Sequence, residues 1–165
     1  LAGKSLEEVT TIVQNFADNM ATLSVAASGA TNPSTGMEIA QVAAGCMEVG
    51  VGLHGEKGKA QSMKTAEETA GIMLDALLED LNVLPEEKLL VLVSGNGATS
   101  LMEQLIVFRS CYAYLLEKGI EIVASHVGAL MTIQEMAGVQ ICIARMNEEL
   151  LDYWNAPCYT PYFKK

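Results

Sequence analysis

The sequence predicts a layered α/β domain with a partly mixed sheet of about five strands, containing parallel and antiparallel pairs. Segments with apolar residues at helical spacing alternate along the chain with short apolar segments of strand length, which is typical of α/β domains. Two predicted strands near the start have no helix between them, so part of the sheet should be antiparallel. No internal repeat is present, and a single domain over residues 1–165 is expected.

The predicted helices begin at a recurring pattern in which Ser or Thr is followed three positions later by Glu. In such a capping box, the hydroxyl and the carboxylate satisfy backbone N–H groups at the helix start. The pattern occurs at Ser5/Glu8, Thr65/Glu68, Ser100/Glu103 and Thr132/Glu135. Asn147 is placed to cap one more helix, while Gly119 and Gly138 are placed to end two of them. The helices are expected at about 5–19, 65–81, 100–118, 132–137 and 148–154.

Short apolar segments bounded by turn-forming residues predict the strands. The segment 88–93 is apolar on both faces, as expected for a strand that helices cover on each side. The strands are expected at about 23–27, 47–54, 88–93, 120–125 and 139–144. Residues 28–36 are dense in turn formers and should be a loop, and the tail 155–165 should be extended.

The charge of the chain argues against nucleic-acid and membrane partners. Ten basic residues against 20 acidic ones give a net charge of −10, and such a surface repels phosphates and anionic membranes. The longest apolar runs are too short and too interrupted to span a bilayer, and no signal peptide is visible. Because the chain begins with Leu1 rather than methionine, we expect a processed or excised piece of a longer protein.

The four cysteines predict neither a metal site nor a disulfide framework. Cys46, Cys111, Cys142 and Cys158 are widely and irregularly spaced, with no CxxC or Cys/His cluster. Reduced thiols in a cytoplasmic protein are the favoured interpretation, and disulfides are the alternative.

The segment 47–58 is the most unusual part of the sequence. Its residues Glu48, Gly50, Gly52 and His54 share one face of the predicted strand. Two glycines on one strand face indicate that another group approaches the backbone there. His54, followed by Gly55, is therefore a candidate reactive group, and the alternative is a histidine that only terminates the strand.

Three other features have stronger structural interpretations than functional ones. Residues 50–55 match GxGxxG, but no helix follows until about residue 65, which disfavours a dinucleotide site. Residues 95–100 lie between a strand and a helix, where α/β sheets bind ligands. They lack the lysine of a P-loop, so a tight turn is favoured over a polar pocket or a subunit contact. His126 ends a strand without a nucleophile or metal ligand near it in sequence and is expected to be structural.

Several segments carry longer motifs in a fixed order. Residues 48–58 resemble E-x-G-x-G-[IL]-H-x-E-P-G, and residues 95–103 resemble N-G-x-G-[GA]-T-P-x-x-E. Residues 127–138 resemble V-G-x-x-M-T-S-x-x-M-A-G, and residues 147–157 resemble D-x-E-L-L-x-L-W-D-A-P. Together with the helix start at 5–9, these motifs are similar to the second half of the dihydroxyacetone-binding subunit of dihydroxyacetone kinases.

The resemblance implies that His54 adds to the carbonyl of a short sugar and forms a covalent hemiaminal, in a site shaped by Gly50, Gly52 and Gly55. A neutral imidazole is a competent nucleophile near pH 7. The family's base, an aspartate, and its second histidine belong to the half that this chain lacks. The resemblance therefore implies the substrate-anchoring part of a cytoplasmic kinase that is inactive alone.

The resemblance also implies partners. No cofactor is expected in this chain, whereas ADP or ATP with magnesium is expected on a partner subunit or domain, which the phosphotransferase system serves in part of the family. A homodimer is expected too. The alternative function is a non-catalytic dihydroxyacetone sensor or co-activator of a transcription regulator, and a purely structural domain is a third candidate.

Two of the departures from the family motifs matter most. Lys57 stands where the family has proline, and a cation there should disfavour the imidazolium form of His54. Ser100 replaces a proline at a helix start, a change that the capping box tolerates. These departures leave the sugar, and the choice between kinase and sensor, open.

Overall fold

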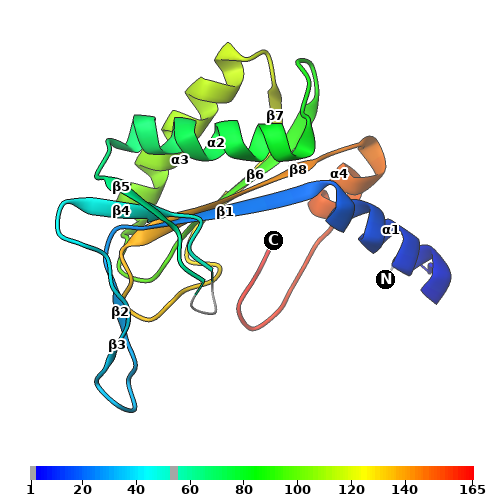
Figure 1. Ribbon diagram of the computed structural model, residues 1–165. Helices are drawn as coiled ribbons and strands as arrows, with labels where there is room; N and C mark the ends of the chain where they lie inside the picture. Colours follow the sequence, from blue (N-terminus) through cyan, green and yellow to red (C-terminus); the bar gives the residue numbers. More distant parts are fainter. Residues whose placement is uncertain (1–2, 53–55) are drawn as a thin grey trace.

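A computed structural model describes residues 3–52 and 56–165 (Figure 1). This part of the chain forms four helices and eight strands in layers, which confirms the α/β class. The elements are α1 (Leu6–Asp18), β1 (Met20–Ala26), β2 (Ala30–Thr31), β3 (Glu38–Ala40), β4 (Cys46–Val49), β5 (Lys59–Ser62), α2 (Ala66–Leu81), β6 (Lys88–Gly95), α3 (Leu101–Glu117), β7 (Glu121–Val127), β8 (Gly138–Arg145) and α4 (Glu148–Asn155).

The main sheet is mixed, as predicted. Its strand order is β5-β4-β1-β8-β6-β7, in which only β6 and β7 are parallel among the described pairs. β1 and β4, which no helix separates, are antiparallel. β8 is the last strand in sequence but pairs on both sides, with β1 and β6, along most of its length. The first strand, β1, and the last strand, β8, are therefore neighbours near the centre of the sheet.

The two faces of the sheet are covered unequally (Figure 1). α2 and α3 lie over one face, where the main core contains fully buried residues such as Leu74, Leu115 and Ile141. On the other face, Leu90 and Ala144 form a smaller cluster with side chains from α1 and α4. No helix in the described part of the chain has the length and apolar content needed to cross a membrane.

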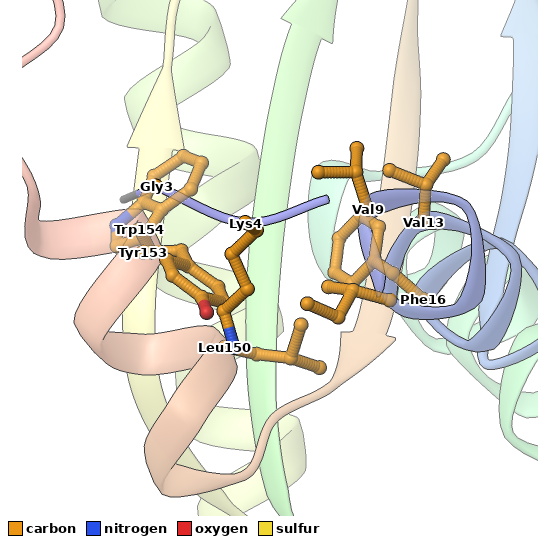
Figure 2. Close-up of a pocket in the computed structure, with 9 residues that line it drawn as sticks. Gly3, Lys4, Val9, Val13, Phe16, Leu150, Tyr153 and Trp154 are labelled. Carbon is orange, nitrogen blue, oxygen red and sulfur yellow. The ribbon is translucent and has the colours of Figure 1, made fainter. Parts of the chain in front are cut away.

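An apolar groove of about 610 Å³ separates α1 from α4 (Figure 2). Val9, Val13 and Phe16 of α1 face Leu150 and the aromatic side chains of α4 across it. Near the groove, Lys4 Nζ lies 3.0 Å from a carboxylate oxygen of Glu149. α1 has no buried residue, so it contributes little to the core.

The helix starts follow the predicted chemistry. Capping boxes form at Ser5, Thr65 and Ser100, and the Asn147 side chain accepts a hydrogen bond from the Leu150 N–H at 2.8 Å. Gly119 follows α3 with a left-handed φ of +73°, as a helix-ending glycine does.

The helix expected at 132–137 was a wrong prediction, because these residues form a turn instead. The Ile133 N–H donates to the Asn96 carbonyl at 2.6 Å, and Met136 forms a β-bridge with Gly97. The Thr31 side chain hydrogen-bonds the Glu135 carboxylate and lowers its pKa, so Glu135 contacts another segment rather than its own helix start. Tertiary contacts override the local capping pattern here.

The strand expected at 47–54 was also wrong in its extent. β4 ends at Val49 because Gly50 adopts a left-handed φ of +87° and turns the chain. The polar strand β5, the hairpin of β2 with β3, and the tail's bridge between Tyr159 and Lys164 were not predicted. β1 begins at Met20, three residues before the predicted start.

Candidate functional site

A partly polar cavity of about 700 Å³ lies among the loops beyond β1 and β4. Three segments enclose it: the hairpin strand β3 with the residues after it, the segment that follows β4, and the turn at 133–136. The lining residues are Ala26, Glu38, Ile39, Ala40, Gln41, Val42, Glu48, Val51, Gly52, Glu56, Lys57, Ile133 and Met136.

Backbone hydrogen bonds hold the segment that follows β4. The Gly50 N–H donates to the Ser24 carbonyl at 2.7 Å, and Val51 is buried. The Gly52 N–H donates to the Glu56 carbonyl at 3.0 Å, so residues 52 and 56 lie close together. His54 and Gly55 lie outside the described residues, whereas Gly52, Glu56 and Lys57 on either side of them line the cavity.

The glycines of this segment differ from the predicted bare strand face. Gly50 follows the strand and is needed for its positive φ. A Cβ on Gly52 would lie within 2.8 Å of the Glu56 side chain, its Cβ included, whereas one on Gly58 would lie 2.6 Å from the Val49 carbonyl oxygen. Gly58 therefore permits a close approach between two backbone segments. The predicted strand face of residues 48, 50, 52 and 54 did not include this glycine.

The glycine-rich loop at 95–100 supports the far wall of the cavity. Asn96 is fully buried, and its amide Nδ2 donates to the Val25 carbonyl at 3.0 Å and to the Ser24 hydroxyl at 3.2 Å. Its backbone accepts from Ile133 and donates to Gly138. The Thr99 hydroxyl donates to the Gly138 carbonyl at 2.6 Å and accepts its N–H at 2.8 Å. The loop thus holds the turn that contributes Ile133 and Met136 to the cavity, which favours the predicted structural interpretation.

The charged lining of the cavity is mainly acidic. Glu38, Glu48 and Glu56 contribute carboxylates, and Lys57 contributes one ammonium group. Carboxylates accept hydrogen bonds from hydroxyl groups, and together they disfavour an anionic ligand. The lining therefore suits a neutral polyhydroxy molecule better than a phosphate ester.

The remaining candidate residues lie away from the cavity. The His126 ring packs edge-on against Phe163, with centroids 5.2 Å apart, as expected for a structural histidine. All four cysteines are free, and burial raises the pKa of the Cys111 thiol to about 12. Among residues 3–52 and 56–165, no group of three His, Cys, Asp or Glu side chains is arranged to hold a metal ion. Among the described residues, the next element after Gly50 and Gly52 is the strand β5 and not a helix, which is not the strand-to-helix order of a dinucleotide fingerprint.

Fold and cavity together define a mixed α/β domain with a small, partly polar cavity at one end of its sheet. The Dak1 domain model matches residues 1–162, and the chain therefore belongs to the Dak1 domain family. It is 36% identical over 163 residues to the dihydroxyacetone-binding subunit DhaK of the PTS-dependent dihydroxyacetone kinase 2 from Listeria innocua, covering 98% of this chain and 49% of that protein. It is 37% identical over 145 residues to the D-erythrulose kinase of Mycolicibacterium smegmatis, covering 87% and 25%.

Solved structures agree with this family. The dihydroxyacetone kinase operon co-activator Dha-DhaQ superposes with a TM-score of 0.87 at 25% identity, over 94% of this chain and 49% of its own. The dihydroxyacetone kinase from C. freundii, in complex with AMP-PNP and Mg2+, superposes with a TM-score of 0.74 at 25% identity, over 91% and 28%. The chain spans about half, or less, of the length of these relatives.

Proposed function

We propose that this chain is the substrate-anchoring part of a dihydroxyacetone-type kinase and that His54 binds a short carbonyl sugar covalently. The observation that carries the proposal is the position of the histidine in the sequence. It lies between Gly52 and Glu56, which hydrogen-bond to each other and line the same cavity. The residues that flank His54 in sequence on both sides therefore contribute to one cavity.

The proposed capture is an addition that keeps every atom of both reactants. An imidazole nitrogen of His54 forms a bond to the carbonyl carbon, and the π electrons of the carbonyl move to its oxygen. That oxygen gains a proton, the imidazole loses one, and the product is a hemiaminal. Because a carbonyl carbon is required, dihydroxyacetone or a similar ketose should bind covalently and glycerol should not.

The acidic lining supports a neutral sugar as the ligand. Glu38 and Glu48 can accept hydrogen bonds from sugar hydroxyls, whereas a phosphorylated product would meet their negative charge. This difference favours release of the product after phosphoryl transfer. Gly50, Gly52 and Gly55 are proposed to shape the site around the bound sugar.

Phosphoryl transfer is proposed to need other parts. The relative from Listeria innocua is named as one subunit of a PTS-dependent kinase, and the C. freundii kinase structure contains AMP-PNP and Mg2+. We propose that a nucleotide-carrying subunit or domain, with its magnesium, acts on the anchored sugar, and that the chain forms a homodimer in the cytoplasm.

The second candidate function is a sensor that binds the same sugar without transferring phosphate. It is favoured by the close superposition on the co-activator Dha-DhaQ. Sugar capture is common to both candidates, so they differ only in phosphoryl transfer. Mixing the sugar-loaded chain with a nucleotide-loaded kinase subunit of a relative and measuring sugar phosphate distinguishes them.

The test of capture is native mass spectrometry of the full chain with dihydroxyacetone. We expect an adduct of the full substrate mass in the parent and in His126→Ala, and none in His54→Ala. His126→Ala is the matched control because it removes the chain's other histidine, outside the cavity. Glycerol should give no adduct in any variant. An equal adduct in His54→Ala would overturn the proposal.

A further inference from the structure

Residues 128–137, which we call the wall segment, connect β7 to β8. Two of them, Ile133 and Met136, line the cavity. Met136 is only 1% exposed and shares a small buried cluster with Ala26 and Val51. Ile133 packs against the same cluster. The position of the wall segment therefore determines the apolar side of the cavity.

Backbone hydrogen bonds attach the wall segment to β6 and to the loop after it, but they leave a gap. The Gly128 N–H donates to the Val93 carbonyl at 3.0 Å. The Ile133 N–H donates to the Asn96 carbonyl at 2.6 Å. Among the described residues, no backbone hydrogen bond joins residues 129–132 to β6 or to the loop that follows it. A side chain is needed to hold this stretch.

The hydroxyl of Ser94, near the end of β6, bridges the gap. Ser94 is 6% exposed. Its Oγ accepts the Leu130 N–H at 3.0 Å and the Met131 N–H at 3.2 Å. It also lies 3.3 Å from the carbonyl oxygens of Met131 and Gly95, to either of which it can donate. The Leu130 N–H is shared with the Gly128 carbonyl at 3.0 Å. Because a hydroxyl donates one hydrogen bond and accepts two, Ser94 uses its full capacity here.

The wall segment contains a strained residue. Gln134 has a φ of +50°, in the left-handed region that residues with a side chain rarely adopt. Its carbonyl oxygen lies against Gly97, where an added Cβ would be 1.9 Å away. A strained conformation of this kind persists only where the surrounding structure holds it. Loss of an attachment should therefore let the wall segment leave its place beside the cavity.

We infer that Ser94 is a positioning residue of the cavity, whose hydroxyl holds the wall segment so that Ile133 and Met136 limit the length of the sugar that binds. Ser94 does not line the cavity, so it acts through the wall segment and not by touching the ligand. The inference deepens the proposed function and rests on it for the nature of the ligand. The position of the wall segment can be measured without any ligand.

Sugar selectivity is the property that distinguishes positioning from a general loss of stability. A wall segment that moves outward removes contacts from a three-carbon ketose and leaves room for a longer one. Ser94→Ala should therefore weaken the binding of dihydroxyacetone roughly tenfold, as the loss of one or two buried hydrogen bonds does, and the binding of four-carbon erythrulose less. The ratio of the two dissociation constants should shift several-fold towards erythrulose, whereas a smaller folded fraction alone would weaken both sugars equally.

Ser110→Ala is the matched control. Ser110 is 8% exposed, and its Oγ donates to the Ile106 carbonyl at 3.2 Å within α3, outside the cavity lining. Both variants thus remove one hydroxyl from a buried serine. Ser110→Ala should leave the ratio of the two dissociation constants as it is in the parent, even if it lowers stability.

Amide hydrogen exchange, followed by NMR on the full chain without sugar, measures the wall segment directly. In Ser94→Ala, the exchange rates of the Ile133 and Met136 amides should rise roughly tenfold more than those of the amides in the central strand β8. Ser110→Ala should show no such difference. Ser94→Thr keeps the hydroxyl on a strand residue and should match the parent in exchange and in sugar binding.

The outcomes separate this inference from sugar capture. Unchanged exchange at Ile133 and Met136 in Ser94→Ala overturns the positioning role whether or not the chain binds a sugar. Faster exchange with an unchanged ratio of dissociation constants overturns it too, and so does a threonine variant that behaves like alanine. If the parent binds neither ketose, the proposed capture fails, and the exchange rates alone decide whether Ser94 holds the wall segment.

Discussion

Asn96 shows how one buried side chain supports the site without touching it. Its amide joins the end of β1 to the loop after β6, and its backbone holds the turn at 133–136. The small residues around it, Gly95 to Thr99, predict a tight turn. Its long-range partners could not be predicted, because Ser24 and Val25 are more than seventy residues away.

Asn96→Asp should destabilise the protein by about 3 kcal/mol and weaken sugar binding. The aspartate would bury a carboxylate against the Val25 carbonyl, to which it cannot donate. Urea unfolding and a dihydroxyacetone titration measure the two effects. Asn15→Asp on the exposed side of α1 is the control, and a similar loss there would contradict the assigned role.

Lys57→Ala should raise the pKa of His54 if the ammonium group lies near the imidazole. Loss of a nearby cation favours the imidazolium form, so less neutral nucleophile is present below pH 7 and capture weakens there. NMR titration of the histidine ring measures this change. Lys59→Ala, which removes a cation from β5, should leave the pKa of His54 unchanged. If both variants changed the pKa of His54 equally, or if neither changed it, the result would argue against the role of Lys57.

The helix starts show where an element can be predicted from local sequence. Three capping boxes appear at the predicted residues, because the hydrogen bonds of a capping box lie within a few residues of each other. The fourth pattern, Thr132/Glu135, is identical in sequence and fails, because the turn pairs with the loop at 95–100 and Glu135 contacts Thr31. Competing contacts of this kind are invisible in one segment of sequence.

Glu103→Gln should reduce stability at neutral pH and have little effect in acid. The Ser100 hydroxyl and backbone N–H donate to the Glu103 carboxylate and lower its pKa in the folded protein. A lowered folded pKa gives stability that is complete above the ordinary carboxyl pKa of about 4.3 and is lost as the pH falls through the folded value. The thermal midpoints of parent and variant should therefore converge as the pH falls below about 4.

The control for this pH effect is on the same helix. Glu117→Gln removes a carboxylate from the C-terminal end of α3, where negative charge opposes the helix dipole. It should leave the thermal midpoint unchanged or raise it. A fall at neutral pH as large as that of Glu103→Gln would mean that the effect comes from net charge alone.

At the scale of the whole molecule, the strand order depends on long-range pairing. The sequence predicts strands and their alternation with helices, and hence the mixed sheet. It does not predict that β8 inserts between β1 and β6, because this depends on contacts across more than one hundred residues. The cavity depends on the same topology, since β3, the segment after β4 and the turn at 133–136 meet only in the folded chain. Gly52 could be predicted from sequence as a residue of the site, whereas the acidic lining could not, and the role of His54 stays a prediction.

The cysteines report on the cooperativity of the whole fold. Cys111 is fully buried in the main core with its pKa raised to about 12, whereas Cys158 is exposed. With a thiol reagent at pH 8, Cys158 should react at once and Cys111 only when the molecule unfolds. The Cys111 rate should therefore rise with urea in step with global unfolding. Rapid labelling of Cys111 in the native protein would show that the core opens locally.

The most direct test of the central claim is carbon-13 NMR of dihydroxyacetone labelled at its carbonyl carbon. Bound to the parent chain, this carbon should change from a trigonal ketone signal to a tetrahedral signal that is distinct from the free hydrate and couples to a nitrogen-15-labelled imidazole. The signal should persist in His126→Ala and vanish in His54→Ala. A bound sugar whose carbonyl stays trigonal, or a tetrahedral signal that survives His54→Ala, would contradict covalent capture by His54.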